Sequence, residues 1–125
     1  MPAKVADASV IGASTFGEPE AEKALSLLDN AELYEPSLLA YELASIARKK
    51  TLRHPEQADD IARALSLSLA LDVTWLDVDQ NETLRIALET GLTTYDASYL
   101  YLARTLGVPL VTFDEQLRRA EHIVS

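Results

Sequence analysis

Short apolar runs alternate with longer segments of helical spacing along the 125 residues of this chain. Strands joined by helices pair in parallel, and the helices then cover both faces of the sheet. This alternation predicts an α/β architecture, because each apolar face must be buried against another layer. The length is near the commonest domain size, so we expect one domain over residues 1–125. The predicted strands are Lys4–Ala6, Leu33–Tyr34, Val73–Val78, Leu110–Phe113 and His122–Val124.

The helical segments are bounded by residues that start or end helices. Pro19 suits a first turn, whereas Gly91 and Gly107 suit the position after a last turn. Residues 65–71 place leucine at every second position, so a strand is an open alternative for the end of the third predicted helix. The predicted helices are Glu18–Leu28, Pro36–Lys50, Pro55–Leu69, Asp79–Thr90, Tyr95–Leu106 and Glu115–Ala120.

Four acidic residues occupy positions that are costly for a charge. Asp7 and Asp114 directly follow the first and the fourth predicted strands. Glu42 and Asp96 lie on the apolar sides of two predicted helices. A charge on an apolar face is costly unless it is paired or bound to a metal ion. Because four carboxylates cannot neutralise one another, their convergence in one place would require a divalent cation.

The topology of the sheet decides whether these acids can meet. In open parallel sheets the active crevice lies beyond the carboxyl ends of the strands, where the strand order reverses. If the first and fourth strands are neighbours there, all four carboxylates can face one pocket. The alternative is that an Asp after a strand simply caps the next helix, which fits Asp114, while Asp96 competes with Thr93 and Thr94 for such a role. Glu42 stands in mid-helix and cannot cap, so the four acids together favour a metal-dependent enzyme.

Composition limits the other classes of function. The absence of cysteine excludes disulfides and thiolate metal sites, and two histidines are too few to indicate a zinc site. The net charge of −9 opposes binding to nucleic acid, although basic residues cluster at 48–53 and at 118–119. No apolar run reaches the roughly 20 residues that span a bilayer, and the N-terminus lacks the pattern of a signal peptide. We therefore expect a cytoplasmic protein without a membrane segment.

Four stretches of the chain resemble the successive motifs of a known family. They are Val5-Ala6-Asp7-Ala8-Ser9, Pro36-Ser37 followed by Glu42, Tyr95-Asp96-Ala97-Ser98-Tyr99-Leu100-Tyr101-Leu102-Ala103, and Leu110-Val111-Thr112-Phe113-Asp114. In this order and spacing the chain resembles the PIN-domain ribonucleases, above all the VapC-like toxins of toxin–antitoxin modules. The resemblance covers essentially the whole chain. It implies a three-layer α/β/α fold with a five-stranded parallel sheet in the order 3-2-1-4-5, in which the first and fourth strands are neighbours.

The resemblance also implies a function and its site residues. The expected activity is cleavage of RNA that leaves a 5′-phosphate and a 3′-hydroxyl, with Mg²⁺ or Mn²⁺ as the cofactor. The expected partners are an antitoxin protein and a second copy of the chain. An antitoxin helix would dock on an apolar surface that includes Leu39, Leu43 and Ile46. The expected catalytic and metal-binding acids are Asp7, Glu42, Asp96 and Asp114, with Ser9 and Thr112 as lesser polar contributors.

Two other kinds of protein also place acids together in an α/β domain. A receiver-like or phosphatase-like module binds Mg²⁺ around an acyl-phosphate and normally needs a lysine near the end of a late strand. No lysine follows Lys50, which argues against that chemistry. A catalytically silent PIN-like domain would only bind a partner protein, and it has no reason to keep four costly charges. Tyr95, Tyr99 and Tyr101 could stack on bases, but tyrosines at helical spacing usually pack a core.

Overall fold

A parallel sheet of four strands forms the centre of the computed structural model, which describes residues 1–122. The order across the sheet is β3-β2-β1-β4, with Val5 of β1 opposite Leu110 of β4. The strands are β1 (Ala3–Ala6), β2 (Glu32–Pro36), β3 (Val73–Leu76) and β4 (Leu110–Val111). The prediction of a parallel sheet with the first and fourth strands side by side is therefore confirmed.

The expected number of five strands is wrong for the part of the chain that the structure describes. Residues 1–122 contain four strands, in the expected relative order. The predicted fifth strand, His122–Val124, lies outside the described residues apart from His122. The last helix runs to Glu121, one residue beyond its predicted end, and His122 is the residue that caps it.

Helices connect the successive strands. They are α1 (Ala8–Thr15), α2 (Ala21–Leu28), α3 (Leu38–Arg53), α4 (Ala58–Leu69), α5 (Gln80–Thr90), α6 (Thr94–Leu106) and α7 (Glu115–Glu121), with a short 3₁₀ helix, η1 (Pro55–Gln57), before α4. Residues 65–69 belong to α4, so the strand alternative for this segment is wrong. Within residues 1–122, no helix is both long and apolar enough to cross a lipid bilayer.

Helix α1 is absent from the sequence-based prediction. Its residues Val10–Ala13 are all buried, so it lacks the polar face whose periodicity would indicate a helix. The carboxylate of Asp7 caps α1 by accepting hydrogen bonds from the backbone N–H groups of Ser9 and Val10. The helix therefore begins directly after β1, and Asp7 occupies the junction between the two elements.

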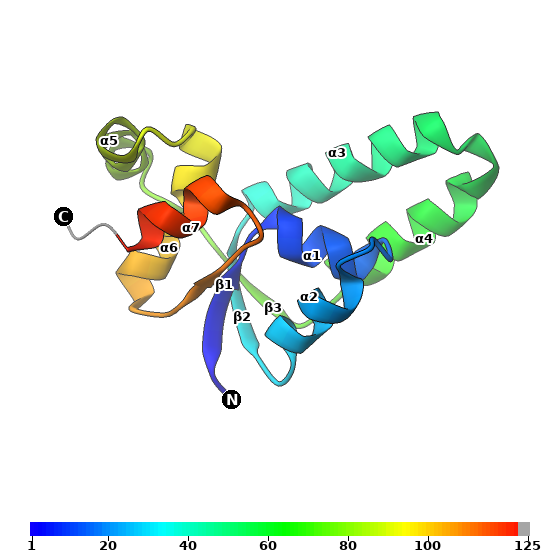
Figure 1. The fold of residues 1–125 in the computed structure, drawn as a ribbon, viewed down its shortest axis with the longest axis horizontal. Coiled ribbons are helices and arrows are strands. Elements are labelled where there is room, and N and C mark those ends of the chain that lie inside the picture. Colours follow the sequence, from blue (N-terminus) through cyan, green and yellow to red (C-terminus); the bar gives the residue numbers. More distant parts are fainter. Residues whose placement is uncertain (123–125) are drawn as a thin grey trace.

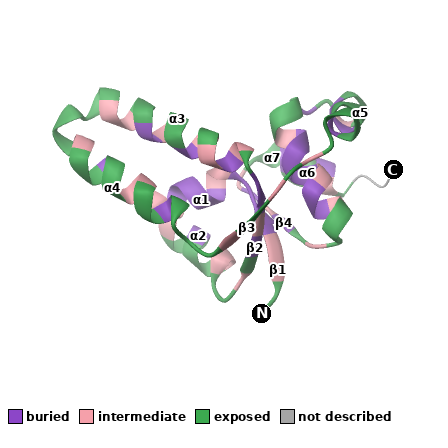
Figure 2. Ribbon diagram, turned by 180° about the vertical axis from the view of Figure 1, so that it is seen from behind, coloured by how far each residue is buried: buried purple, intermediate pink, exposed green. Residues whose placement is uncertain are grey.

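The helices lie on both sides of the sheet. In Figure 1, α1 and α2 lie on one side of the strands, and α5, α6 and α7 lie on the other. Helices α3 and α4 form a hairpin that extends away from the sheet. Figure 2 shows that buried residues gather around the strands, α1 and α6, whereas the far end of the hairpin is mostly exposed. This arrangement is the expected three-layer α/β/α fold.

The core packs tightly around the end of β1. Val5 and Ala6 are fully buried in the same hydrophobic cluster as Leu43 of α3 and Leu100 of α6. Gly12 of α1 lies so close to α3 that an added Cβ atom would stand 3.0 Å from the Ile46 side chain. Such dense packing leaves little freedom to the residues that follow β1, and Asp7 is the first of them.

Candidate metal centre

The four acids predicted from the sequence come from four different parts of the fold. Asp7 stands between β1 and α1, and Asp114 stands between β4 and α7. Glu42 lies in the second turn of α3, and Asp96 lies in the first turn of α6. Because β1 and β4 are parallel neighbours, their carboxyl ends place Asp7 and Asp114 at the same edge of the sheet.

The charges of these acids act on one another. The pKa of Asp96 is raised by burial first, and then by the negative charges of Asp114 and Asp7. Burial also raises the pKa of Glu42, a hydrogen bond from Tyr99 lowers it, and the charges of Asp96 and Asp7 raise it further. None of the ion pairs among residues 1–122 includes one of the four acids. The acids therefore face one another without a basic side chain to compensate them.

Asp7 is the most enclosed of the four acids, with 5% of its surface exposed. Its Oδ1 accepts a 2.6 Å hydrogen bond from Ser9 Oγ in addition to the two backbone N–H groups of α1. Its Oδ2 accepts a 2.6 Å hydrogen bond from Thr112 Oγ1. Burial raises the pKa of Asp7, whereas the hydrogen bonds from Ser9, Thr112 and the helix backbone lower it. The hydrogen bonds hold the carboxylate in one orientation.

The hydroxyls of Ser9 and Thr112 join the end of β1 to the end of β4. Ser9 Oγ accepts the N–H of Phe113 at 2.9 Å, and Thr112 Oγ1 accepts the N–H of Asp114 at 2.9 Å. Both hydroxyls also donate to Asp7. Thr112 lies in the predicted strand Leu110–Phe113, where a threonine often serves only as a strand-forming residue. Its buried hydroxyl instead belongs to the hydrogen-bond network around Asp7.

The capping alternative is correct for Asp114 and wrong for Asp96. Oδ1 of Asp114 accepts the N–H of Leu117 at 2.8 Å and caps α7. Thr93, not Asp96, caps α6. Capping uses one carboxylate oxygen of Asp114, and the other has no hydrogen-bond partner within residues 1–122. Asp114 can therefore cap a helix and still offer an oxygen to a ligand.

The available donors are carboxylate oxygens, which are the ligands that Mg²⁺ and Mn²⁺ prefer. Within residues 1–122, no three acidic or histidine side chains lie close enough together, as they stand in this structure, to hold a metal ion. Mg²⁺ uses few protein ligands and keeps several waters, so an open set of acids suits it. Burial first, and then the negative charges of the neighbouring acids, raise the pKa values of Glu42 and Asp96, and a bound cation would offset both effects.

A fifth acid, Glu35, belongs to the same region and is missing from the sequence-based prediction. Its side chain is 0% exposed, and Oε2 accepts the backbone N–H of Ala6 at 3.1 Å. Oε1 is buried without any hydrogen-bond partner. Burial, with a further contribution from the charge of Asp7, raises the pKa of Glu35 to about 9. Strand periodicity could have indicated this burial, because Glu35 and the buried Leu33 lie two residues apart in β2.

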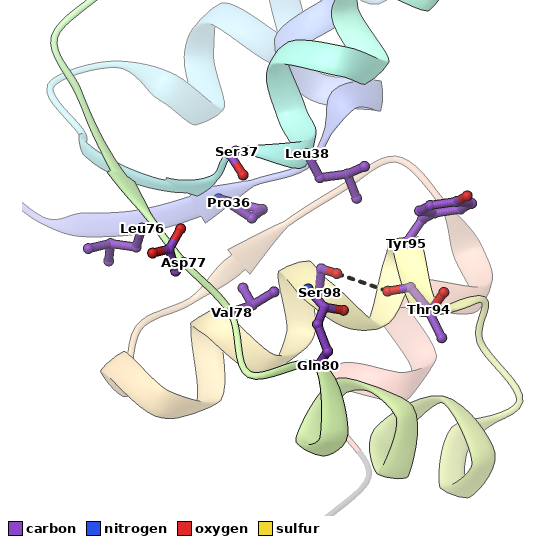
Figure 3. A pocket seen from close by; sticks show the side chains of 10 residues that line it. All are labelled: Pro36, Ser37, Leu38, Leu76, Asp77, Val78, Gln80, Thr94, Tyr95 and Ser98. Carbon is purple, nitrogen blue, oxygen red and sulfur yellow. Dashed lines mark hydrogen bonds between the residues drawn. The ribbon is translucent and has the colours of Figure 1, made fainter.

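Two hollows open beside the acids. The first has a volume of about 460 Å³, and Figure 3 shows the side chains of α3, α5, α6 and the end of β3 that surround it. None of the four acids lines it, although Tyr95, the neighbour of Asp96, stands at its edge. The second, of about 230 Å³, shares Leu38 and Tyr95 with the first and also includes Tyr41 and Glu42. The two hollows thus extend the surface from the acids towards β3.

Comparisons with known proteins agree with the geometry. The model of the PIN domain family matches residues 4–123 of this chain. Ribonuclease VapC3 of Pyrobaculum aerophilum is 35% identical over 118 residues, which cover 90% of this chain and 90% of that protein.

Two solved structures have the same fold. PAE2754 from Pyrobaculum aerophilum has a TM-score of 0.79 at 27% identity, over 97% of this chain and 86% of that chain. VapBC2 from Rickettsia felis, bound to a DNA fragment from their promoter, has a TM-score of 0.66 at 16% identity. That match covers 98% of this chain and 96% of the other.

Proposed function

This chain belongs to the PIN-domain family, and from that premise we propose that it is a divalent-metal-dependent endoribonuclease, the toxin of a toxin–antitoxin pair acting in the cytoplasm. The single observation that supports the proposal most is the group of four uncompensated acids around the carboxyl ends of β1 and β4. The similarity to a protein named ribonuclease VapC3 supports RNA as the substrate.

The proposed mechanism assigns a role to each acid. Bound Mg²⁺ or Mn²⁺ would activate water and neutralise charge on the phosphoryl and leaving oxygens. Asp7 and Asp96 would hold the ion as direct ligands. Glu42 and Asp114 would bind a second ion or accept hydrogen bonds from a water molecule and orient it. The hydroxyls of Ser9 and Thr112 would keep Asp7 in its orientation, since both donate to its carboxylate.

The RNA is proposed to lie over the hollows beside the acids. Tyr41 and Tyr95 are 74% and 61% exposed, and each directly precedes one of the acids, Glu42 and Asp96. Exposed aromatic rings can stack on the bases of a single strand without a requirement for sequence. The net charge of −9 opposes phosphate binding, so metal ions would have to neutralise the acids before RNA binds.

The proposed protein partners are an antitoxin and a second copy of the chain. The similarity of fold to VapBC2 supports the first. The expected docking surface needs correction, because Leu39 and Leu43 are each 1% exposed and pack in the core. A hollow of about 300 Å³ between α1, α2 and α4 offers exposed apolar side chains instead, which are Leu25, Leu67 and Leu71. An antitoxin helix would dock there, and a basic side chain of the antitoxin would reach the acids.

The test of the activity is cleavage of a single-stranded RNA by the purified protein. We expect cleavage with Mg²⁺ or Mn²⁺, none in excess EDTA, and products with a 5′-phosphate. The other candidate is a catalytically silent PIN-like domain. A folded protein that cleaves no RNA, with or without added metal ions, would favour it. Co-expression with the product of the neighbouring gene should give an inactive complex. In isolation, the protein should elute near twice its 13.7 kDa mass, and a strictly monomeric protein would refute the dimer.

A further inference from the structure

Beneath the acids, the phenol of Tyr99 makes direct contact with one of them. Tyr99 is 1% exposed, and its Oη donates a 2.6 Å hydrogen bond to Oε1 of Glu42. Tyr99 follows Asp96 by three residues on α6, so both side chains lie on the same face of that helix. Helix α6 thus supplies one acid of the site and the group that holds another acid, Glu42 of α3.

The hydrogen bond has a fixed direction. The phenol of Tyr99 carries one proton and donates it to the carboxylate, which can only accept when it is ionised. Oε1 of Glu42 therefore accepts this bond and is held toward the buried phenol, whereas Oε2 has no hydrogen-bond partner within residues 1–122. One of the two oxygens of Glu42 is held in the protein interior, and one is left for a ligand.

We propose that Tyr99 is a positioning residue that holds Oε1 of Glu42 toward the protein interior, and that it thereby makes the site favour Mg²⁺ and Mn²⁺ over Ca²⁺. This inference rests on the proposed metal-dependent function, with Glu42 binding an ion directly. Ca²⁺ takes more oxygen ligands than Mg²⁺ and commonly uses both oxygens of one carboxylate. A carboxylate whose Oε1 is held toward a buried phenol does not turn both oxygens toward one ion, so Ca²⁺ loses a ligand that Mg²⁺ does not need.

The ring of Tyr99 also fills the core, and this role must be separated from that of the hydroxyl. Tyr99→Phe keeps the ring and removes only the hydroxyl, so a packing role predicts little change. Loss of the hydroxyl would free Oε1 of Glu42 and let the side chain turn. A general loosening of the site would weaken the binding of all metal ions alike. Loss of positioning would weaken the binding of Mg²⁺ and Mn²⁺ and leave the binding of Ca²⁺ unchanged or tighter. Only this second pattern supports the inference.

The experiment is calorimetric titration of metal-free protein with Mn²⁺, Mg²⁺ and Ca²⁺ separately. For Tyr99→Phe we expect roughly tenfold weaker binding of Mn²⁺ and Mg²⁺, the usual effect of removing a group that orients a ligand. Ca²⁺ should bind as in the wild type or more tightly. The matched control is Tyr34→Phe, which removes a 2.7 Å hydrogen bond from another tyrosine to Glu32 on the exposed surface. This control should bind all three ions as the wild type does.

A second variant makes the test independent of how well Tyr99→Phe folds. Glu42→Asp keeps the charge but shortens the side chain, so the carboxylate no longer reaches the phenol. It should show the same loss of preference for Mg²⁺, and adding Tyr99→Phe to it should change the preference no further. If Tyr99→Phe weakens all three ions equally or none of them, the inference is wrong and the proposed function stands. If the wild type binds neither Mg²⁺ nor Mn²⁺, the proposed function fails and takes this inference with it.

Discussion

Replacing the buried Glu35 with glutamine should reduce the dependence of stability on pH. Glu35 is fully buried, receives one hydrogen bond from the N–H of Ala6, and leaves Oε1 without a partner. The negative charge of Asp7 adds to the effect of burial and raises the pKa of Glu35 further. The phenol of Tyr99 lies near enough to respond to the charge of Glu35. A glutamine has the same shape and can accept the same hydrogen bond, but it has no proton to release.

The size of the effect follows from the pKa of Glu35, which burial raises from 4.5 to about 9. Between these two values the folded protein keeps a proton that the unfolded chain has released, so stability falls as the pH rises. One proton corresponds to about 1.4 kcal/mol per pH unit, so the free energy of unfolding should fall by about 3 kcal/mol from pH 6 to pH 8. For a domain of this length, that loss lowers the melting temperature by roughly 10 °C.

The assay is thermal unfolding in EDTA at pH 6, 7 and 8 for the wild type and for Glu35→Gln. The amide lacks a partner for its own N–H groups, so the variant is expected to be less stable than the wild type at pH 6. The difference in melting temperature between the two proteins should shrink or change sign by pH 8, because only the wild type loses stability through Glu35. Glu32→Gln is the matched control, since Glu32 begins the same strand with its side chain exposed. Parallel curves for wild type and Glu35→Gln would show that Glu35 does not stay protonated in the folded protein.

Three further predictions concern the acids themselves. Asp7→Asn should lower RNA cleavage by roughly 100-fold or more with an unchanged circular dichroism spectrum, because it removes a ligand charge without opening a cavity; an active variant would refute the role of Asp7. Thr112→Val should lower the free energy of unfolding by about 1–3 kcal/mol in denaturant titrations, since Asp7 loses a donor and the N–H of Asp114 loses its acceptor; an unchanged midpoint would contradict the network. Metal-free protein should melt higher at mildly acidic pH than at pH 8, because the raised pKa values of Asp7, Glu42 and Asp96 mean that the folded state binds more protons. Mg²⁺ at roughly 100 times its Kd should restore about 3 kcal/mol at pH 8, and an unchanged melting temperature would count against a converged site.

The order of the elements could be predicted from the sequence because most of them have one polar face. Helices such as α5 and α6 show a clear period and end in Gly91 and Gly107, which adopt the left-handed conformation that favours glycine. Helix α1 could not be predicted, since Val10–Ala13 are buried on every side and leave no period to detect. Its start depends on Asp7, whose capping contacts exist only in the folded chain.

The four candidate acids could be selected from the sequence because a charge on an apolar face is costly unless a partner or a bound ion compensates it, and their role in a metal site stays a prediction. Their supporting groups were less predictable, because they depend on contacts between residues far apart in the chain. Thr112 contacts Asp7 across 105 positions, and Tyr99 contacts Glu42 across 57. Leu39 and Leu43 were expected on a docking surface, but both are buried in the core, and helical periodicity alone does not distinguish a core face from an interface. Glu35 is missing from the prediction because the predicted strand, Leu33–Tyr34, ends one residue before it.

The most direct test of the metal centre is the binding of Mn²⁺ measured by electron paramagnetic resonance, in which the signal of free Mn²⁺ disappears as the ion binds. We expect wild-type protein at neutral pH to take up one or two ions per chain, Asp7→Asn and Asp96→Asn each to lose at least one of them, and added Mg²⁺ to release the bound Mn²⁺. Glu121→Gln is a suitable control, because Glu121 is not one of the four acids and its carboxylate accepts a hydrogen bond from the backbone N–H of Leu110. If the wild type leaves all Mn²⁺ free, or if both Asp variants bind it as well as the wild type does, the four acids do not form a metal site.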